Sequence, residues 1–195
     1  MKADQIALQR AIRTCWDKMG AEPGVKNKWN ITGPAEIRQE LAYATTTTNY
    51  QFQFAANAGP VPSTTLNNVQ LGENDIFWMG AVQILYGSGA NSNNRAYYSR
   101  GFTPSDDALY NGTLDVAIES TNPVISLPMQ WFREEGDTPS LAGIVVLPMV
   151  RRLTGKFSNI MFTINLGKTA VNISGLTLTA NGFISVAPIG VLARP

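Results

Sequence analysis

The sequence predicts an all-β fold, an antiparallel β-sandwich or barrel of about eight strands that follows an N-terminal helical arm. Apolar residues recur with helical spacing near the N-terminus, whereas from about residue 45 onward they alternate with polar residues. The alternating segments are short and are separated by turns rich in glycine, asparagine and proline. We therefore divide the chain into a helical arm, residues 1–44, and a sandwich domain, residues 45–195.

The composition limits the class of protein. The 195 residues suffice for one domain with a substantial core. Charged residues make up 15% of the chain, against a usual figure of about 25%, and the net charge is +1. This excludes a disordered charged tail and a polycation that coats nucleic acid. No stretch approaches the roughly 18 apolar residues of a membrane span, and we expect no signal peptide.

Two absences from the sequence restrict the chemistry. The chain has no histidine, which excludes Ser-His-Asp and Cys-His nucleophile systems and the usual zinc sites. Its one cysteine, Cys15, cannot form an intrachain disulfide. We expect no catalytic residue, no cofactor and no metal site, so the function has to be inferred from the architecture.

The arm is predicted to hold two helices. The first covers residues 3–19 and is followed by Gly20 and Pro23, which are typical of a helix end. The second is predicted to open at Thr32-Gly33-Pro34 and to run to about Tyr43. The apolar face of the first helix has the spacing i, i+4, i+7, i+8, i+11 and consists of Leu8, Ile12, Cys15, Trp16 and Met19.

The strands follow from period-two alternation and from apolar runs. Gly80 inside the longest apolar stretch predicts a bulge or bend, and Pro148 predicts an edge strand or a bulge. Tight turns are expected at Gly155-Lys156, Gly167-Lys168 and Asn181-Gly182. The predicted strand segments are 45–54, 69–86, 114–119, 124–131, 142–153, 160–166, 171–179 and 183–192.

Other side chains could in principle act in catalysis or metal binding, but a structural role is favoured for each. Asp115 and Glu119 lie four apart on one strand and could act as an acid–base pair, but a solvated strand face is favoured. Asp106-Asp107 matches no calcium loop. Cys15 lies on the apolar helix face and is predicted to be a buried structural residue. The remaining carboxylates of this kind, Glu134, Glu135 and Asp137, are predicted to form a charged turn.

The organisation of the chain resembles that of the single jelly-roll capsid proteins of tail-less icosahedral viruses, above all those of bacteria. A helical segment precedes roughly eight antiparallel strands with long Gly, Asn, Ser and Thr loops and few charges. The resemblance covers about Thr45 to Pro195 and rests on organisation, with no signature motif. Residues 1–30 hold six basic and three acidic residues, whereas many such proteins carry a strongly basic arm. This departure favours a genome that is packaged separately or lies under a membrane.

The resemblance implies a jelly roll and a structural virion protein, a self-assembling and non-enzymatic shell subunit. The implied partners are identical subunits, as a trimer or pentamer that builds a larger shell, with other virion proteins or an inner membrane as further partners. No nucleic-acid motif is present, and the implied location is the virion after synthesis in the host cytoplasm. The residues expected at subunit interfaces are Leu8, Ile12, Trp16 and Met19 of the arm and the aromatic residues Tyr97, Tyr98 and Phe102.

A second function is compatible with the same sandwich. The aromatic residues, with Trp78 and Trp131 as the main candidates, could stack on sugar rings. The alternative prediction is therefore a carbohydrate- or receptor-binding module, similar to a spike or lectin domain.

Overall fold

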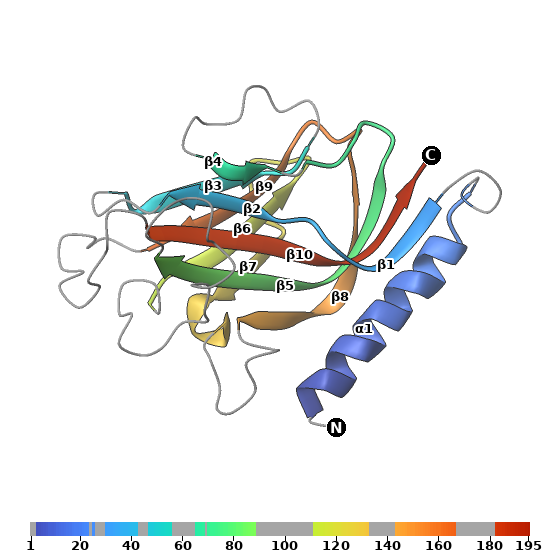
Figure 1. Cartoon of the computed structure of the whole chain (residues 1–195), viewed down its shortest axis with the longest axis horizontal. Coiled ribbons are helices and arrows are strands. Elements are labelled where there is room, and N and C mark those ends of the chain that lie inside the picture. The colour runs from blue at the N-terminus through green and yellow to red at the C-terminus, as the bar shows by residue number, and fades with distance from the viewer. Residues whose placement is uncertain are drawn as a thin grey trace.

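The chain folds as two antiparallel sheets packed face to face, with one helix on the outside (Figure 1). This arrangement comes from a computed structural model. The structure describes residues 3–23, 25, 30–42, 47–55, 65–68, 70–88, 111–132, 143–166 and 182–195. An antiparallel β-sandwich with an N-terminal helix is the fold that the sequence predicts.

The larger sheet contains six strands. Its order is β4-β2-β10-β5-β8, and β1 also pairs with β10. Strands β5 and β10 are the longest, with 13 residues each, and form the centre of the sheet. The strands are β1 (Asn30–Glu36), β2 (Gln39–Ala42), β4 (Thr65–Asn68), β5 (Ile76–Ser88), β8 (Ile144–Thr154) and β10 (Gly182–Arg194).

The smaller sheet contains four strands in the order β3-β9-β6-β7. A 3-10 turn, η3 (Met129–Phe132), follows β7 and contacts both β7 and β8, so it joins the two sheets at one side of the sandwich. The strands are β3 (Asn49–Gln53), β6 (Thr113–Ile118), β7 (Ile125–Pro128) and β9 (Ile160–Asn165).

The strand pairs are nested in sequence order, which is the winding of a jelly roll. Strand β6 pairs with β7, β5 with β8, β3 with β9, and β2 with β10. The chain therefore resembles one long hairpin that alternates between the two sheets. The contacts of β5 with β10 and of β6 with β9 then complete the two sheets. This topology agrees with the jelly roll that the resemblance implies.

The main core lies between the two sheets and is built by period-two alternation. In β9, for example, Ile160, Phe162 and Ile164 are fully buried and the intervening residues are half-exposed. The rings of Phe54 and Phe162 meet edge to face, with centroids 5.0 Å apart and an interplanar angle of 71°. Such aromatic pairs add about 0.5–1.5 kcal/mol beyond the burial of their apolar area.

The predicted irregularity at Gly80 and Pro148 is confirmed, and both residues belong to one bulge. Met79 pairs with Arg151 and Ala81 pairs with Val146, so residues 147–150 of β8 lie opposite Gly80. In the described part of the chain, β8 is also the last strand of its sheet. Pro148 has no N–H to donate, and a bulge at an outer strand hinders pairing with another strand.

The second predicted helix is wrong, because residues 30–42 form β1 and β2 of the larger sheet. Ile37 and Leu41 are four apart, a spacing that places them on one face in a strand as well as in a helix. Both belong to the main core. Gln39 lies between them, is buried, and donates through Nε2 to the backbone carbonyl of Gln53, 2.5 Å away. Part of the predicted arm is thus part of the sandwich.

Other element predictions have different outcomes. The helix predicted over residues 3–19 is confirmed as α1 (Ala3–Gly20). The strand predicted over 124–131 ends at Pro128, which has no N–H for the ladder, and η3 follows it. The turn at Gly155-Lys156 is confirmed. The strand predicted over 171–179, the turn residues Gly167, Lys168 and Asn181, and Asp106-Asp107 lie outside the described residues.

Candidate functional site

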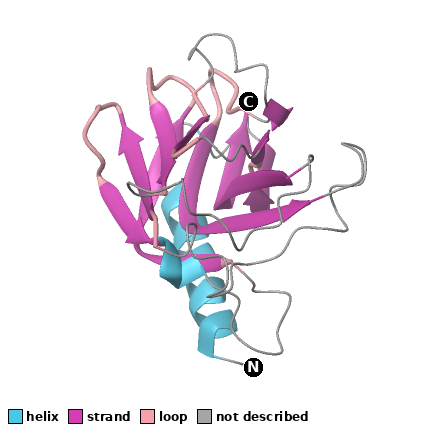
Figure 2. Cartoon of the chain, turned by 90° about the vertical axis from the view of Figure 1, so that its left-hand side faces the viewer, coloured by secondary structure: helices cyan, strands magenta, loops and turns pink. Residues whose placement is uncertain are grey.

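Helix α1 lies on the outer face of the larger sheet, on the side away from the main core (Figures 1 and 2). It packs there on a second apolar cluster that is separate from the main core. The cluster contains Cys15, Met19, Val25, Ile76, Val191 and Ala193, with Ile12, Ile31, Trp78 and Val150 packed against it.

Two glycines let the helix approach the sheet closely. A methyl group at Gly80 of β5 would lie 3.0 Å from Cys15 Sγ and 3.2 Å from Ala11 Cβ. At Gly33 of β1 it would lie 3.0 Å from the ring of Trp16. All three distances are shorter than ordinary van der Waals contact between carbon or sulfur atoms. The helix therefore packs so close to the sheet that a larger residue at either position would push it away.

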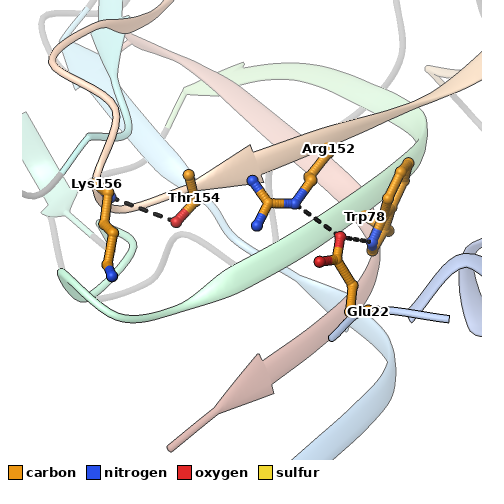
Figure 3. Close-up of polar contacts among 5 residues, drawn as sticks. All are labelled: Glu22, Trp78, Arg152, Thr154 and Lys156. Atoms are coloured by element: carbon orange, nitrogen blue, oxygen red, sulfur yellow. Dashed lines mark hydrogen bonds and ion pairs between the residues drawn. The ribbon is translucent and has the colours of Figure 1, made fainter. Parts of the chain in front are cut away.

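The carboxylate of Glu22 links the C-terminal end of the helix to the larger sheet through two hydrogen bonds (Figure 3). Glu22 follows α1, and its Oε1 accepts hydrogen bonds from Trp78 Nε1 at 3.1 Å and from Arg152 Nε at 2.7 Å. Trp78 and Arg152 are paired neighbours on β5 and β8, so they present their donors side by side. The Glu22 side chain is only 11% exposed, which strengthens this ion pair relative to one at the open surface. In the same view, the backbone amide of Lys156 faces the hydroxyl of Thr154 at the following turn.

The helix residues that the sequence predicts at subunit interfaces have different surroundings. Met19 is fully buried against the chain's own sheet, and Ile12 packs on the same cluster. Leu8 is half-buried although it shares a helix face with Met19, and Trp16 is 39% exposed. Leu8 and Trp16 thus keep surface for a contact with another molecule. Tyr97, Tyr98 and Phe102 lie outside the described residues.

The outward face of α1 is exposed along its length. Ile6, Arg10, Arg13 and Asp17 have the spacing i, i+4, i+7, i+11, which aligns them opposite the buried residues. Trp16 lies at one side of this row, where its ring packs on Gly33 of β1 and 39% of the residue stays exposed. Ile6 is 36% exposed, and both arginine residues are exposed. We call these five residues the α1 ridge.

The smaller sheet presents a polar outer face, on the opposite side of the sandwich from α1. Asp115 lies at its centre and accepts hydrogen bonds from Ser126 Oγ at 2.6 Å and from Asn165 Nδ2 at 2.8 Å. Asn49 Nδ2 in turn donates to Asn165 Oδ1 at 2.7 Å. These four residues come from β7, β6, β9 and β3, so the row crosses the whole sheet. The row holds the outer side chains in fixed positions.

The predicted carboxylate pair does not form an acid–base site. Asp115 belongs to the polar row, whereas Glu119 lies past the end of β6 and accepts from the backbone amide of Ser158. Glu119 has a positive φ of 55°, so it has left the strand geometry that would align the two side chains. Among the described residues, no group of three or more His, Cys, Asp or Glu could hold a metal ion. Glu134, Glu135 and Asp137 lie outside those residues.

Trp78 and Trp131, the two main candidates for stacking on sugar rings, have different surroundings. Trp78 is half-buried and donates to Glu22, so its indole is already engaged. Trp131 on η3 is 59% exposed, and Phe132 next to it is fully buried. The 3-10 turn therefore anchors itself in the core through Phe132 and points Trp131 outward.

Cys15 is a buried thiol, as the helix pattern predicts. Loss of hydration on burial raises the pKa of its thiol to about 11, and a hydrogen bond with its own backbone opposes that shift. The thiol stays protonated at neutral pH, which makes it a poor nucleophile.

In the part of the chain that the structure describes, no helix is long and apolar enough to cross a membrane. No protein-family model, no curated protein and no solved structure matches the chain.

Proposed function

We propose that the protein is a structural virion protein, a capsid subunit that acts by self-assembly and not by catalysis. The observation that carries this proposal is the nested strand pairing of a single jelly roll, with α1 on its outer face. Jelly rolls of this kind occur in viral capsid proteins, and also in lectins and cupins.

The composition supports assembly. Charged residues are depleted at the centres of protein interfaces, and only 15% of this chain is charged. The outer face of the smaller sheet is polar, with Asp115 as the one charged residue of its four strands, and its side chains are held in a hydrogen-bonded row. A surface that is already ordered loses little conformational entropy when it binds a partner.

The partners in this proposal are identical subunits, as a trimer or pentamer that builds a larger shell in the virion. Other virion proteins or an inner membrane are further proposed partners, and the host cytoplasm is the proposed site of synthesis. Obligate contacts of this type typically bury about 2,000 Å² or more in each interface.

Electron microscopy of the purified protein tests the proposal. We expect negative-stain images at high protein concentration to show discrete rings or closed shells. Removal of residues 1–20 should change the particles, because it removes α1. Featureless monomers from the full chain at every concentration would contradict the proposal.

A carbohydrate-binding function is the second candidate, and the exposure of Trp131 favours it. Exposed tryptophan rings stack on sugars, and Trp131 is 59% exposed at one side of the sandwich. A glycan array tests this function. We expect no binding if the capsid proposal is right, whereas binding that is lost in Trp131→Ala would favour a lectin-like module.

A further inference from the structure

We infer that the α1 ridge of one copy docks on the outer face of the smaller sheet of another copy. This inference rests on the proposed function, because it names the two surfaces through which identical subunits would associate.

The positions of the two surfaces require two molecules. Ile6, Arg10, Arg13 and Asp17 of the α1 ridge lie on the helix face opposite the residues that pack on the larger sheet. The polar row lies on the outer face of the smaller sheet. The whole sandwich separates them, so one chain cannot bring its own ridge to its own row. A contact between two different surfaces is heterologous, and its repetition builds rings or continuous lattices.

The charges of the two sides are complementary. The helix side, residues 3–23 together with the strands that α1 contacts (β1, β5, β8 and β10), holds six basic and four acidic residues. On the ridge itself, Arg10 and Arg13 outnumber Asp17. Strands β3, β6, β7 and β9 contain no lysine or arginine, and the smaller-sheet side carries Asp115 and Glu119. Opposite net charges favour contact between unlike surfaces and disfavour contact between two ridges.

The ridge also has apolar side chains for a contact, and the row has groups to receive the arginines. Ile6 and Trp16 flank the two arginines and are more than one third exposed. Arginine pairs well with carboxylate and amide oxygens. Asp115 and Asn165 present such oxygens on this face, and each of these oxygens accepts one hydrogen bond within the row. Tryptophan and arginine, together with tyrosine, are enriched among the residues that contribute most to the binding energy of interfaces.

Charge reversal on each surface, followed by mixing, tests the inference. The ridge variant is Arg10→Glu with Arg13→Glu. The face variant is Gln51→Lys with Thr113→Lys, two exposed outer positions whose replacement breaks no hydrogen bond of the polar row. We expect each variant alone to self-associate at least tenfold more weakly than the wild type. A one-to-one mixture should regain association, because the altered ridge then meets the altered face.

A control separates this effect from net charge. Lys18→Glu with Lys156→Glu makes the same charge change as the ridge variant at exposed positions outside both surfaces. We expect this control to associate like the wild type. Association of the wild type should also weaken as salt rises, because salt screens exposed charges. If a double variant fails to fold by circular dichroism, the single changes Arg13→Gln and Gln51→Lys take its place.

The outcomes distinguish the inference from the proposed function. Wild-type particles with unchanged association in both variants would overturn the inference and leave the capsid proposal standing. A wild type that stays monomeric at all concentrations would overturn both. Binding of the wild type to phosphatidylserine vesicles without self-association would also overturn the inference, because the ridge would then serve a membrane.

Discussion

At the scale of single residues, Glu22 links the helix to the sheet. Its Oε1 accepts from Trp78 on β5 and from Arg152 on β8, so one atom connects three segments that are distant in sequence. No local pattern signals this contact, because Glu22 stands in an ordinary polar turn after the helix. The sequence predicts the apolar side of the helix but not the polar contact that fixes its end.

Glu22→Ala should lower the free energy of unfolding by about 1–3 kcal/mol, since it removes two hydrogen bonds to a charged and largely buried group. Urea denaturation measures this change. The matched control is Glu73→Ala, an exposed carboxylate for which we expect a change within about 0.5 kcal/mol. Equal effects of the two substitutions would show that the Glu22 contacts contribute nothing to stability.

Cys15 should react slowly with thiol reagents. Its pKa of about 11, against an ordinary 9.0, implies roughly a hundredfold smaller thiolate fraction at pH 8. Because the folded pKa is raised, the thiol contribution to stability is complete below pH 9 and is lost as the pH rises toward 11. Labelling with a chromogenic disulfide in native buffer and in urea measures the protection. Equally fast labelling in both would contradict burial.

At the scale of elements, spacing alone does not distinguish a short helix from a strand. The i, i+4 pair Ile37 and Leu41 suits either, and Pro34 is common at a helix start, so the sequence favours a helix. The structure instead pairs Leu41 with β10 and β4, and the backbone N–H of Ile37 donates to the carbonyl of Pro188 in β10. Long-range pairing decides the outcome, and it is not visible in a local window. The alternating strands and the Gly80 bulge could be predicted because their signals are local.

Helix α1 is attached to a separate small cluster, so it should open more easily than the sandwich. The main core contains no residue of α1. Hydrogen exchange should therefore show faster exchange of α1 amides than of β5 and β10 amides, because local opening costs less than global unfolding. Gly80→Val should increase α1 exchange at least tenfold, since its side chain would press against Ala11 and Cys15. Uniform protection across helix and strands would contradict a separately packed helix.

At the scale of the whole molecule, the nested pairing joins residues that are far apart in sequence. Strand β2 pairs with β10, and β3 pairs with β9, so segments near the two ends of the chain lie side by side. Contacts of high sequence separation slow folding, because a large loop must close before they form. We expect refolding of the isolated chain in milliseconds to seconds or longer, as in other all-β sandwiches. Stopped-flow fluorescence would reveal this, and microsecond refolding would contradict it.

The candidate surfaces could be predicted only in part. The sequence identifies the helix face and, within it, Leu8 and Trp16, which keep exposed area. It assigns Met19 to a subunit contact, but a sequence pattern cannot say that the chain's own sheet occupies that face. The polar row of Asn49, Asp115, Ser126 and Asn165 is invisible in sequence, because its members lie on four strands that only the fold brings together.

The central claim is that this chain assembles with copies of itself, and its mass in solution tests that claim most directly. Sedimentation velocity over a concentration series, at low and at high salt, gives that mass. We predict a concentration-dependent shift from the 21.2 kDa monomer to discrete trimers, pentamers or larger closed particles, weakened by salt. A single 21.2 kDa species at every concentration would contradict the account.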